Sequence, residues 1–338
     1  MAHLVVTGAA GFIGSNFVHW LCSEHPDREV VVVDKLTYAG NLGNLEPIKD
    51  RIRFVRADIA DAEAMAEVLR GADGIINFAA ESHVDRSLEA AAPFLHSNVV
   101  GVQVILDLVK ELEVPRFLQI STDEVYGSTP EGTRFNEEDR LNPSSPYAAS
   151  KAAADHLVQA AVHTWNVPAL ITRASNNYGP YQFPEKLLPL MITNIMEEKP
   201  LPVYGDGMQK REWLHVHDHC TAVWAVWQRG EIGRIYNLGT GDEVANLELI
   251  KTLLAVMDAS EELITFVADR PGHDRRYALD ISRLTTELGW QQQITLEEGL
   301  QATIEWYRDN RPWWESIKSG QYREYYERMY GRRGPAQQ

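Results

Sequence analysis

Through the first half of the chain, short runs of consecutive apolar residues alternate with longer amphipathic stretches. Apolar runs of this length, rich in β-branched residues, predict strands buried on both faces, and the amphipathic stretches predict helices. The predicted strands cover residues 4–7, 30–34, 53–56, 74–78, 117–121 and 169–173. The predicted helices cover residues 12–23, 62–69, 93–112 and 146–165. This alternation predicts βαβ units and hence a doubly wound parallel sheet, a Rossmann-type α/β fold.

The regular alternation stops at about residue 173, and a loop rich in Asn, Gly, Pro and Tyr follows at residues 176–184. Loops beyond the carboxyl ends of parallel strands are where this architecture binds ligands. We therefore predict a Rossmann domain over residues 1–175 and a smaller C-terminal region over residues 176–330 that mainly binds substrate. This division leaves open that some elements of the smaller region join the main sheet. The last dozen residues are expected to be frayed.

Composition and charge narrow the class of protein. Of 338 residues, 44% are hydrophobic and 24% charged, as in an ordinary globular protein. With 32 basic and 48 acidic side chains the net charge is −16, which argues against nucleic acid or an anionic membrane as the main partner. The two cysteines, Cys22 and Cys220, form no paired motif, so we expect a reducing compartment. Because no run of about 18 residues is apolar and the first strand starts at once, we expect a soluble, cytoplasmic protein without a membrane span or signal peptide.

A glycine-rich turn follows the first predicted strand, with Gly8, Gly11 and Gly14 leading into the first predicted helix. Glycine permits the tight turn and lets backbone N–H groups approach a pyrophosphate at the helix N-terminus. The second strand ends at Asp34, 20 residues beyond Gly14, where a carboxylate can accept hydrogen bonds from an adenosine ribose. Asp34 favours NAD over NADP because it repels a 2′-phosphate, although Lys35 beside it weakens that inference.

The first domain is therefore predicted to bind NAD, and a structural glycine turn without a ligand is the alternative. The other residues expected to line the cofactor groove are Phe12, Ile13, Asp58, Ile59, Ala79 and Ala80.

Tyr147 and Lys151 lie four residues apart at the start of the predicted helix 146–165, on one helical face. A nearby ammonium group stabilises a phenolate, so we expect Lys151 to lower the pKa of Tyr147 and make it a usable base for a sugar or alcohol hydroxyl. Alone, such a pair is usually a surface coincidence. Combined with the glycine turn, it favours redox chemistry.

The fifth predicted strand runs directly into Thr122, Asp123 and Glu124, at the carboxyl end of the sheet. Adjacent acids in a partly desolvated cleft disfavour joint ionisation, so one can stay protonated as an acid while the other acts as a base. A solvated turn is the alternative interpretation of this pair.

Four blocks of sequence make the chain recognisable. Residues 79–87 read AAESHVDRS, residues 121–127 STDEVYG, residues 175–186 SNNYGPYQFPEK and residues 270–277 RPGHDRRY. With the glycine turn and the Tyr147/Lys151 pair, these blocks resemble the extended short-chain dehydrogenase/reductase superfamily. More narrowly, they resemble the dTDP-glucose 4,6-dehydratase family, over about residues 2–310.

The resemblance implies a lyase that converts dTDP-glucose to dTDP-4-keto-6-deoxyglucose and water, a step of deoxysugar biosynthesis. Tyr147, which with Lys151 would also contact the cofactor, would deprotonate the C4 hydroxyl with support from Thr122 while NAD takes the C4 hydride. Glu124 would then remove the C5 proton while Asp123 protonates the leaving C6 hydroxyl. Return of the hydride to C6 would leave the cofactor as it began.

Three alternatives stay open at this point. A UDP-sugar 4-epimerase or a UDP-glucuronate decarboxylase would share the cofactor and the Tyr147/Lys151 pair. An enzyme that only oxidises and reduces at C4 has no need of Asp123 and Glu124, however. Elimination of water does need such an additional acid and base. A non-catalytic NAD-dependent binding protein has no reason to keep all of these groups.

A nucleotide diphosphate needs positive charge despite the net charge of −16, and the second half of the chain supplies Lys186, Arg211, Arg270, Arg275 and Arg276. For Arg275 and Arg276, an exposed position without a ligand is an equal alternative. The resemblance implies that substrate contacts are made by Ser82, His83, Asn176, Glu185, Lys186, Leu187, Pro202, Tyr204, Arg211, Asn246, Arg270, His273 and Tyr277.

One competing motif places His215, His217 and His219 beside Cys220. Alternate residues of a strand share a face, so a metal site is conceivable there. Asp218 has the character of a helix N-cap, which would end the strand and splay the ligands. We therefore expect no metal.

Two further expectations concern packing. In this superfamily, helices corresponding to 93–112 and 146–165 usually build a homodimer interface, and we expect the same here. The C-terminal aromatic residues are expected to pack against the body of the protein rather than form a partner surface. They are Trp306, Tyr307, Trp313, Trp314, Tyr322, Tyr325 and Tyr326.

Overall fold

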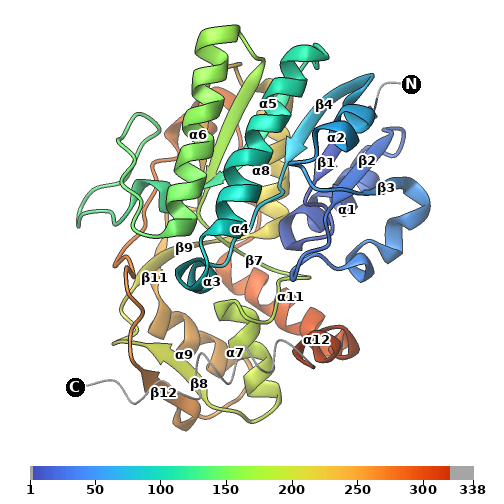
Figure 1. The fold of residues 1–338 in the computed structure, drawn as a ribbon. Coiled ribbons are helices and arrows are strands. Elements are labelled where there is room, and N and C mark those ends of the chain that lie inside the picture. The colour runs from blue at the N-terminus through green and yellow to red at the C-terminus, as the bar shows by residue number, and fades with distance from the viewer. Residues whose placement is uncertain (1–2, 320–338) are drawn as a thin grey trace.

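The computed structural model describes residues 3–319 and is built around a seven-stranded parallel sheet (Figure 1). The strand order is β10-β6-β5-β4-β1-β2-β3, and every neighbouring pair is parallel. The strands are β1 (His3–Thr7), β2 (Val30–Asp34), β3 (Ile52–Arg56), β4 (Ala72–Asn77), β5 (Phe117–Thr122), β6 (Ala169–Ala174) and β10 (Ile235–Leu238). The doubly wound Rossmann-type fold is confirmed, and the six predicted strands agree with the structure to within two residues.

Helices cover both faces of this sheet. One face packs on α1 (Phe12–Glu24), α8 (Val216–Arg229) and α10 (Ser282–Leu288), and the other packs on α2 (Ala62–Leu69), α5 (Gly101–Glu111) and α6 (Pro146–Trp165). The division follows the strand period of two, because Leu4 and Val6 enter the first core while Val5 between them enters the second. Burial on both faces explains the unbroken apolar runs of these strands.

The predicted helix at residues 93–112 is a composite rod. It consists of α4 (Ala92–Leu95), a π-helical turn (His96–Val100) and α5. Among residues 3–319 it is the one helix long and apolar enough to cross a membrane, with a mean hydropathy of 1.4 over its best window. Val102, Ile105 and Leu106 are buried against the second face of the sheet, and a core helix passes the same test of length and composition.

A second lobe lies at the carboxyl edge of the sheet, in the lower half of Figure 1. It holds a three-stranded sheet, ordered β11-β9-β7, and a parallel pair, β12-β8. Its strands are β7 (Asn176–Tyr178), β8 (Leu201–Tyr204), β9 (Lys210–His215), β11 (Glu243–Ala245) and β12 (Ile264–Val267). Its helices are α7 (Leu187–Met196), α9 (Asn246–Val256), α11 (Leu296–Asp309) and α12 (Arg311–Lys318). The chain does not stay in this lobe, because β10 and α10 return to the main sheet.

The second lobe has a hydrophobic core of its own. Leu188, Trp213, Leu249 and Leu300 are buried together, and the aromatic residues of the last two helices join them. Tyr307 and Trp314 are fully buried, which confirms the prediction that these aromatics serve packing. The remaining predicted aromatics, Tyr322, Tyr325 and Tyr326, and the terminus expected to be frayed lie outside the described residues.

The short elements lie mainly at ligand-facing loops. They are α3 (Val84–Glu89) and the 3₁₀ turns Leu42–Asn44, Glu46–Arg51, Asp123–Tyr126 and Glu261–Leu263. Most of these fall after the carboxyl end of a strand, where the chain leaves the sheet.

A buried ion pair joins β6 to α6. Arg173 Nε donates to Asp155 Oδ2 at 2.8 Å, and Arg173 Nη1 donates to the hydroxyl of Tyr126 at 2.8 Å. Both charged side chains are at most 2% exposed. Loss of the cation would leave Asp155 as an uncompensated charge in the core.

We therefore expect Arg173→Met to lower the free energy of unfolding by about 3–5 kcal/mol. The matched control is Arg311→Met, which breaks the exposed ion pair with Glu315 and should leave the free energy of unfolding nearly unchanged. Urea unfolding followed by circular dichroism measures both variants. Equal midpoints for the two variants would contradict a structural role for the buried pair.

Candidate active site

The first candidate ligand site is a groove at the turn between β1 and α1. Gly8 has φ +65°, and a Cβ at this position would lie 2.5 Å from the backbone nitrogen of Ala79. A Cβ at Gly14 would lie 2.3 Å from the carbonyl oxygen of Gly8. Any side chain at these two positions would push α1 away from the sheet. The turn therefore presents bare backbone and a helix N-terminus to the groove, which is the geometry that suits a pyrophosphate.

All of the residues predicted to contact the cofactor line this one groove. They are Gly8, Gly11, Phe12, Ile13, Gly14, Asp34, Lys35, Asp58, Ile59, Ala79, Ala80, Tyr147 and Lys151. The segment after β2 also contributes to the wall through Thr37, Tyr38, Ala39 and Gly40, which sequence reasoning missed. Their position directly after Asp34, at the carboxyl end of a strand, was the signal that could have found them.

Asp34 is fixed at the end of β2 by backbone donors. Its carboxylate accepts from the N–H of Ala10 at 2.9 Å and from the N–H of Leu36 at 2.7 Å. Lys35 Nζ donates to Asp58 Oδ2 at 2.5 Å, so its charge is already compensated. Burial opposes the ionisation of Asp58, but hydrogen bonds from Lys35 and Ala60 lower its pKa to about 2. The lysine that weakened the preference for NAD over NADP is thus held in an ion pair.

Tyr147 and Lys151 project from the first two turns of α6, which Ser145 caps. Both side chains are buried and line the groove. Lys151 Nζ donates to the carbonyl oxygen of Ile120 at 2.6 Å, and burial lowers the pKa of Lys151 to about 8.

The expected effect of Lys151 on Tyr147 is wrong for the protein without ligands. Burial and the nearby carboxyl of Glu124 raise the pKa of Tyr147, and a hydrogen bond with Thr122 opposes the rise. The ammonium group of Lys151 is directed at a backbone carbonyl instead of at the phenol. Burial of the phenol, reinforced by its negative neighbours, therefore decides the direction of the shift.

Thr122 ends β5, and Asp123 and Glu124 begin the 3₁₀ turn after it. The N–H of Glu124 donates to the hydroxyl of Thr122, which caps the turn. Asp123 is 3% exposed, and burial together with the neighbouring Glu124 raises its pKa well above its usual value. Its Oδ2 atom is buried without a hydrogen-bond partner in the described structure.

Glu124 has a different environment from its neighbour. Burial raises the pKa of Glu124, but Arg270, Lys186 and Arg211 oppose the rise. It also lines a second pocket, whereas Asp123 does not. Burial therefore favours the protonated form of both carboxyls, but three cations oppose this at Glu124, whereas at Asp123 the neighbouring carboxyl reinforces it.

The second pocket lies between the two lobes and adjoins the groove, with which it shares Glu185 and Lys186. The other predicted substrate residues on its wall are His83, Asn176, Leu187, Pro202, Tyr204, Arg211, Asn246, Arg270 and His273. Ser82 lines the groove instead. Lys186 immediately precedes α7, so the pocket combines three cations with a helix N-terminus, a set that suits a diphosphate.

Tyr277 lies behind the wall of this pocket. The guanidinium of Arg211 stacks over its ring at 4.1 Å, and the Tyr277 hydroxyl donates to Asp274 Oδ2 at 2.7 Å. Tyr277 therefore positions Arg211 and does not itself line the pocket. Arg275 forms an ion pair with Asp206, and Arg276 forms one with Glu243, both away from the pocket. This supports the alternative that these two arginines do not bind the ligand.

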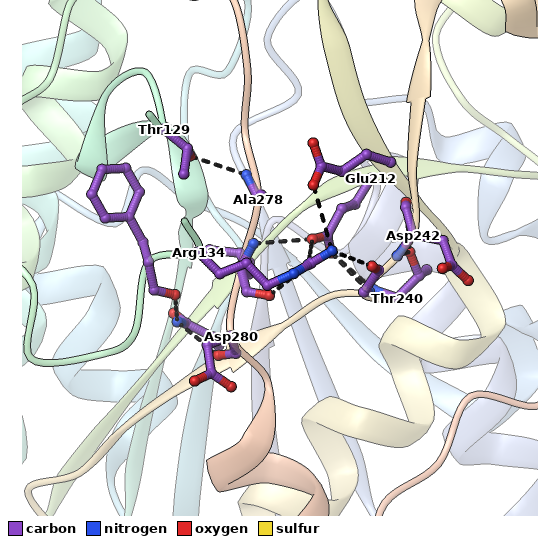
Figure 2. Close-up of polar contacts among 12 residues, drawn as sticks. Thr129, Arg134, Glu212, Thr240, Asp242, Ala278 and Asp280 are labelled. Carbon is purple, nitrogen blue, oxygen red and sulfur yellow. Dashed lines mark hydrogen bonds and ion pairs between the residues drawn. The ribbon is translucent and has the colours of Figure 1, made fainter. Parts of the chain in front are cut away.

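A polar network anchors the strand that carries Arg211 (Figure 2). Glu212, the next residue of β9, is buried and accepts from Arg134 at 2.8 Å. It also accepts backbone N–H bonds from Thr240, Gly241 and Leu279. Because successive side chains of a strand point to opposite faces, fixing Glu212 in this network directs Arg211 into the pocket.

The histidine motif has another structure than predicted. His215, rather than Asp218, caps α8, and Asp218 in the first turn accepts the N–H groups of Gln293 and Ile294. His219 Nδ1 is hydrogen-bonded to Asn177 at 2.8 Å. Within residues 3–319 no three His, Cys, Asp or Glu side chains are grouped as metal ligands.

Comparison with known proteins agrees with this geometry. The sequence matches the GDP-mannose 4,6-dehydratase family over residues 5–303. A dTDP-glucose 4,6-dehydratase from Streptomyces niveus is 49% identical over 322 residues, which cover 94% of this chain and 96% of that protein. The chain belongs to the dTDP-glucose 4,6-dehydratase family.

Solved structures of similar proteins extend the comparison. The crystal structure of a dTDP-glucose 4,6-dehydratase from Streptomyces venezuelae, with NAD and TDP bound, has a TM-score of 0.91 and 48% identity, and covers 94% of this chain and 100% of that one. A UDP-glucuronic acid 4-epimerase from Bacillus cereus, in complex with UDP-glucuronic acid and NAD, has a TM-score of 0.85 but only 27% identity, over 91% of this chain and 99% of that one. The resemblance drawn from the four sequence blocks is confirmed, and the dehydratase family is favoured over the epimerase by sequence.

Asp85 is a pocket residue that sequence reasoning missed. It lies on α3 of the first lobe, is 6% exposed, and accepts from Arg270 Nη1 at 3.2 Å and from the hydroxyl of Tyr204 at 3.1 Å. It stands in the first of the four recognised blocks, so its position was visible, but its partners were not. A carboxylate in a pocket for anions is explained by its role of holding Arg270.

We expect Asp85→Asn to raise the dissociation constant of thymidine diphosphate, used as a probe, by about tenfold, because the charged hydrogen bond to Arg270 is lost. Asp206→Asn is the matched control, since Asp206 pairs with the exposed Arg275 outside the pocket. Titration calorimetry measures both. Equal affinities for the two variants would contradict the anchoring role of Asp85.

Proposed function

We propose that this protein is an NAD-dependent dTDP-glucose 4,6-dehydratase, which converts dTDP-glucose to dTDP-4-keto-6-deoxyglucose and water. The observation that carries the proposal is the contrast between Asp123 and Glu124, a proton-holding acid and a cation-supported base. They follow β5 at the junction of a dinucleotide groove and a diphosphate pocket. An enzyme that only oxidises and reduces at C4 does not need this additional acid and base.

The groove fits NAD by its own features. Gly8 and Gly14 leave room for the pyrophosphate, and Asp34 offers a fixed acceptor to the ribose. When bound, NAD accepts a hydride from the sugar and later returns it, and the positive charge of its nicotinamide ring favours the phenolate form of Tyr147.

The first stage is removal of the C4 hydroxyl proton by Tyr147. The phenol lines the groove and is hydrogen-bonded to Thr122, so its proton and that of the sugar can be exchanged locally. Lys151, held by the carbonyl oxygen of Ile120, adds a positive charge below the phenol on the same helical face. Because the C4 hydride passes to the bound NAD as the proton leaves, the product of this stage is a C4 ketone.

The second stage is loss of water across C5 and C6. The C4 ketone acidifies the C5–H, and Glu124 takes this proton as the electron pair moves toward the carbonyl. Asp123 gives its proton to the C6 hydroxyl, which leaves as water. In the last stage C6 accepts the returned hydride and Glu124 gives its proton back to C5. The proton that Tyr147 took from the C4 hydroxyl replaces the one that Asp123 lost with the water, so the enzyme returns to its starting state and the sugar loses one water in all.

We also propose a homodimer built on the rod 92–111 and α6. Leu95, Val100 and Trp165 are each about half exposed, and all three belong to the rod 92–111 or to the end of α6. Exposed apolar side chains on two adjacent helices favour burial against a second copy.

The cytoplasm is the proposed location, supported by two buried free cysteines and the absence of a paired cysteine motif.

The experiment for the reaction uses dTDP-glucose with deuterium at C4 and the purified protein. We expect the product to be lighter by one water and to carry the deuterium at C6, as read by mass spectrometry and NMR. Inverted stereochemistry at C4 with no loss of mass would identify an epimerase. No change, even with added NAD, would favour a binding protein.

Substitution of the two acids separates their roles. Glu124→Gln is expected to lower kcat by about 10²–10⁴-fold, with loss of solvent deuterium exchange at C5. Asp123→Asn should slow water loss by a similar factor while C5 exchange persists. Glu131→Gln is the control, because Glu131 is exposed. Normal turnover by Glu124→Gln would contradict the assignment of the base.

The dependence of kcat/KM on pH follows from the same shifts, because this quantity reports the pKa values of the free enzyme. Glu124 must be ionised, and because burial raises its pKa, kcat/KM should fall with decreasing pH above the usual glutamate range. Lys151 must be charged, and because its pKa is lowered to about 8, kcat/KM should fall as the pH rises through that value. Thermal unfolding at each pH is the control for denaturation. A kcat/KM that stays constant through this range at high pH would contradict the role of Lys151.

A further inference from the structure

Three loops meet beside the cofactor groove, at a point the reaction scheme does not use. Tyr38, from the segment after β2, contacts Phe183 edge-on, with ring centroids 5.6 Å apart at 83°. Both rings line the groove. Phe183 belongs to the loop between β7 and α7, which also carries Glu185 and Lys186 into the pocket between the lobes. The contact therefore joins the first lobe to the second directly over the groove wall.

Arg86 closes this contact into a ring of interactions. Its guanidinium lies over the ring of Tyr38 at 4.1 Å, and its Nε and Nη2 atoms donate to Glu185 Oε2 at 3.2 and 3.0 Å. The side chain of Glu185 is only 1% exposed. Arg86 itself lies on α3 and lines neither the groove nor the pocket. We call Tyr38, Arg86, Phe183 and Glu185 the clasp.

The clasp links both lobes through interactions that each add modest stability. The aromatic pair and the partly buried cation over a ring each add modest stability, and the charged hydrogen bond to a buried carboxylate contributes more. The links share Tyr38 and Arg86, so loss of either side chain opens the ring. Opening would free the segment after β2, which forms one wall of the groove.

We propose that the clasp retains the cofactor in its groove, with Arg86 as a positioning residue that acts through Tyr38. The proposal rests on the proposed function, because it takes the groove to hold NAD. A reaction that returns to the sugar the hydrogen it removes does not require exchange of the cofactor between turnovers. Slow opening of this wall of the groove therefore does not lower the rate of turnover, and it prevents loss of the cofactor in mid-reaction.

The test compares NAD content and NAD release in the full-length protein and its variants. Content is measured by chromatography of the denatured protein. Release is followed at 340 nm with excess alcohol dehydrogenase and ethanol, which convert freed NAD to NADH. Tyr38→Ala and Arg86→Met are expected to raise the release rate by about tenfold or more, since each removes at least one of these contacts.

Matched variants distinguish the clasp from direct contact with the cofactor. Tyr38→Phe keeps the ring but loses the hydrogen bonds of the hydroxyl with Glu185 and Ser82, so it should release NAD more slowly than Tyr38→Ala. Arg275→Met, which loses an exposed ion pair, should release NAD at about the wild-type rate. Tyr38→Ala combined with Arg86→Met should release NAD no faster than Tyr38→Ala alone, because both open one ring. If Arg86→Met folds poorly, as judged by urea unfolding, the comparison of Tyr38→Ala with Tyr38→Phe decides.

Wild-type rates in folded Arg86→Met, or equal release by Tyr38→Phe and Tyr38→Ala, would overturn the clasp. The proposed function would fail under a different result. A wild-type protein that holds NAD but leaves dTDP-glucose unchanged would contradict the proposed dehydratase activity and would leave the clasp hypothesis intact. A wild-type protein that holds no NAD, even after incubation with it, would overturn the clasp as well.

Discussion

Two carboxyl groups buried side by side at the end of β5 set the main electrostatic constraint on this molecule. In a desolvated cleft Asp123 and Glu124 cannot both be ionised cheaply, and nothing in the first lobe supplies enough positive charge to support one of them. Arg211, Arg270 and Lys186 all come from the second lobe. The position of that lobe over the carboxyl edge of the sheet is therefore tied to the protonation states that the proposed chemistry needs.

This dependence explains why so many interactions around the pocket serve to orient cations. Tyr277 supports Arg211 from behind, Asp85 holds Arg270, and Glu212 fixes the strand on which Arg211 stands. Each of these groups is buried and paired, so a cation on the pocket wall loses little additional order when a ligand binds. Preorganisation of this kind places the entropic cost in folding rather than in binding.

The sequence predicted the first lobe well, because its signals are local. Central parallel strands have continuous apolar runs, the glycine turn has a fixed relation to β1 and Asp34, and Tyr147 and Lys151 share a helical face. The second lobe was predicted only as mixed elements, since its strands are short and pair with segments distant in the chain, as β9 does with β7 and β11. The sign of the pKa shift at Tyr147 was missed because it depends on burial of the phenol and on the proximity of Glu124, and folding produces both. Asp85 and the clasp were missed for the same reason, as contacts between lobes have no local pattern.

The order of strands in the main sheet has a consequence for synthesis. β6 ends at residue 174, but its neighbour β10 starts only at residue 235, after β7, α7, β8 and β9 of the second lobe have been made. While the ribosome adds the residues between them, one edge of the nascent sheet exposes unpaired N–H and C=O groups and apolar side chains. Such an edge is a template for pairing with other chains. The interval before β10 emerges is therefore the period in which this chain most depends on a chaperone, or on rapid elongation, to avoid aggregation.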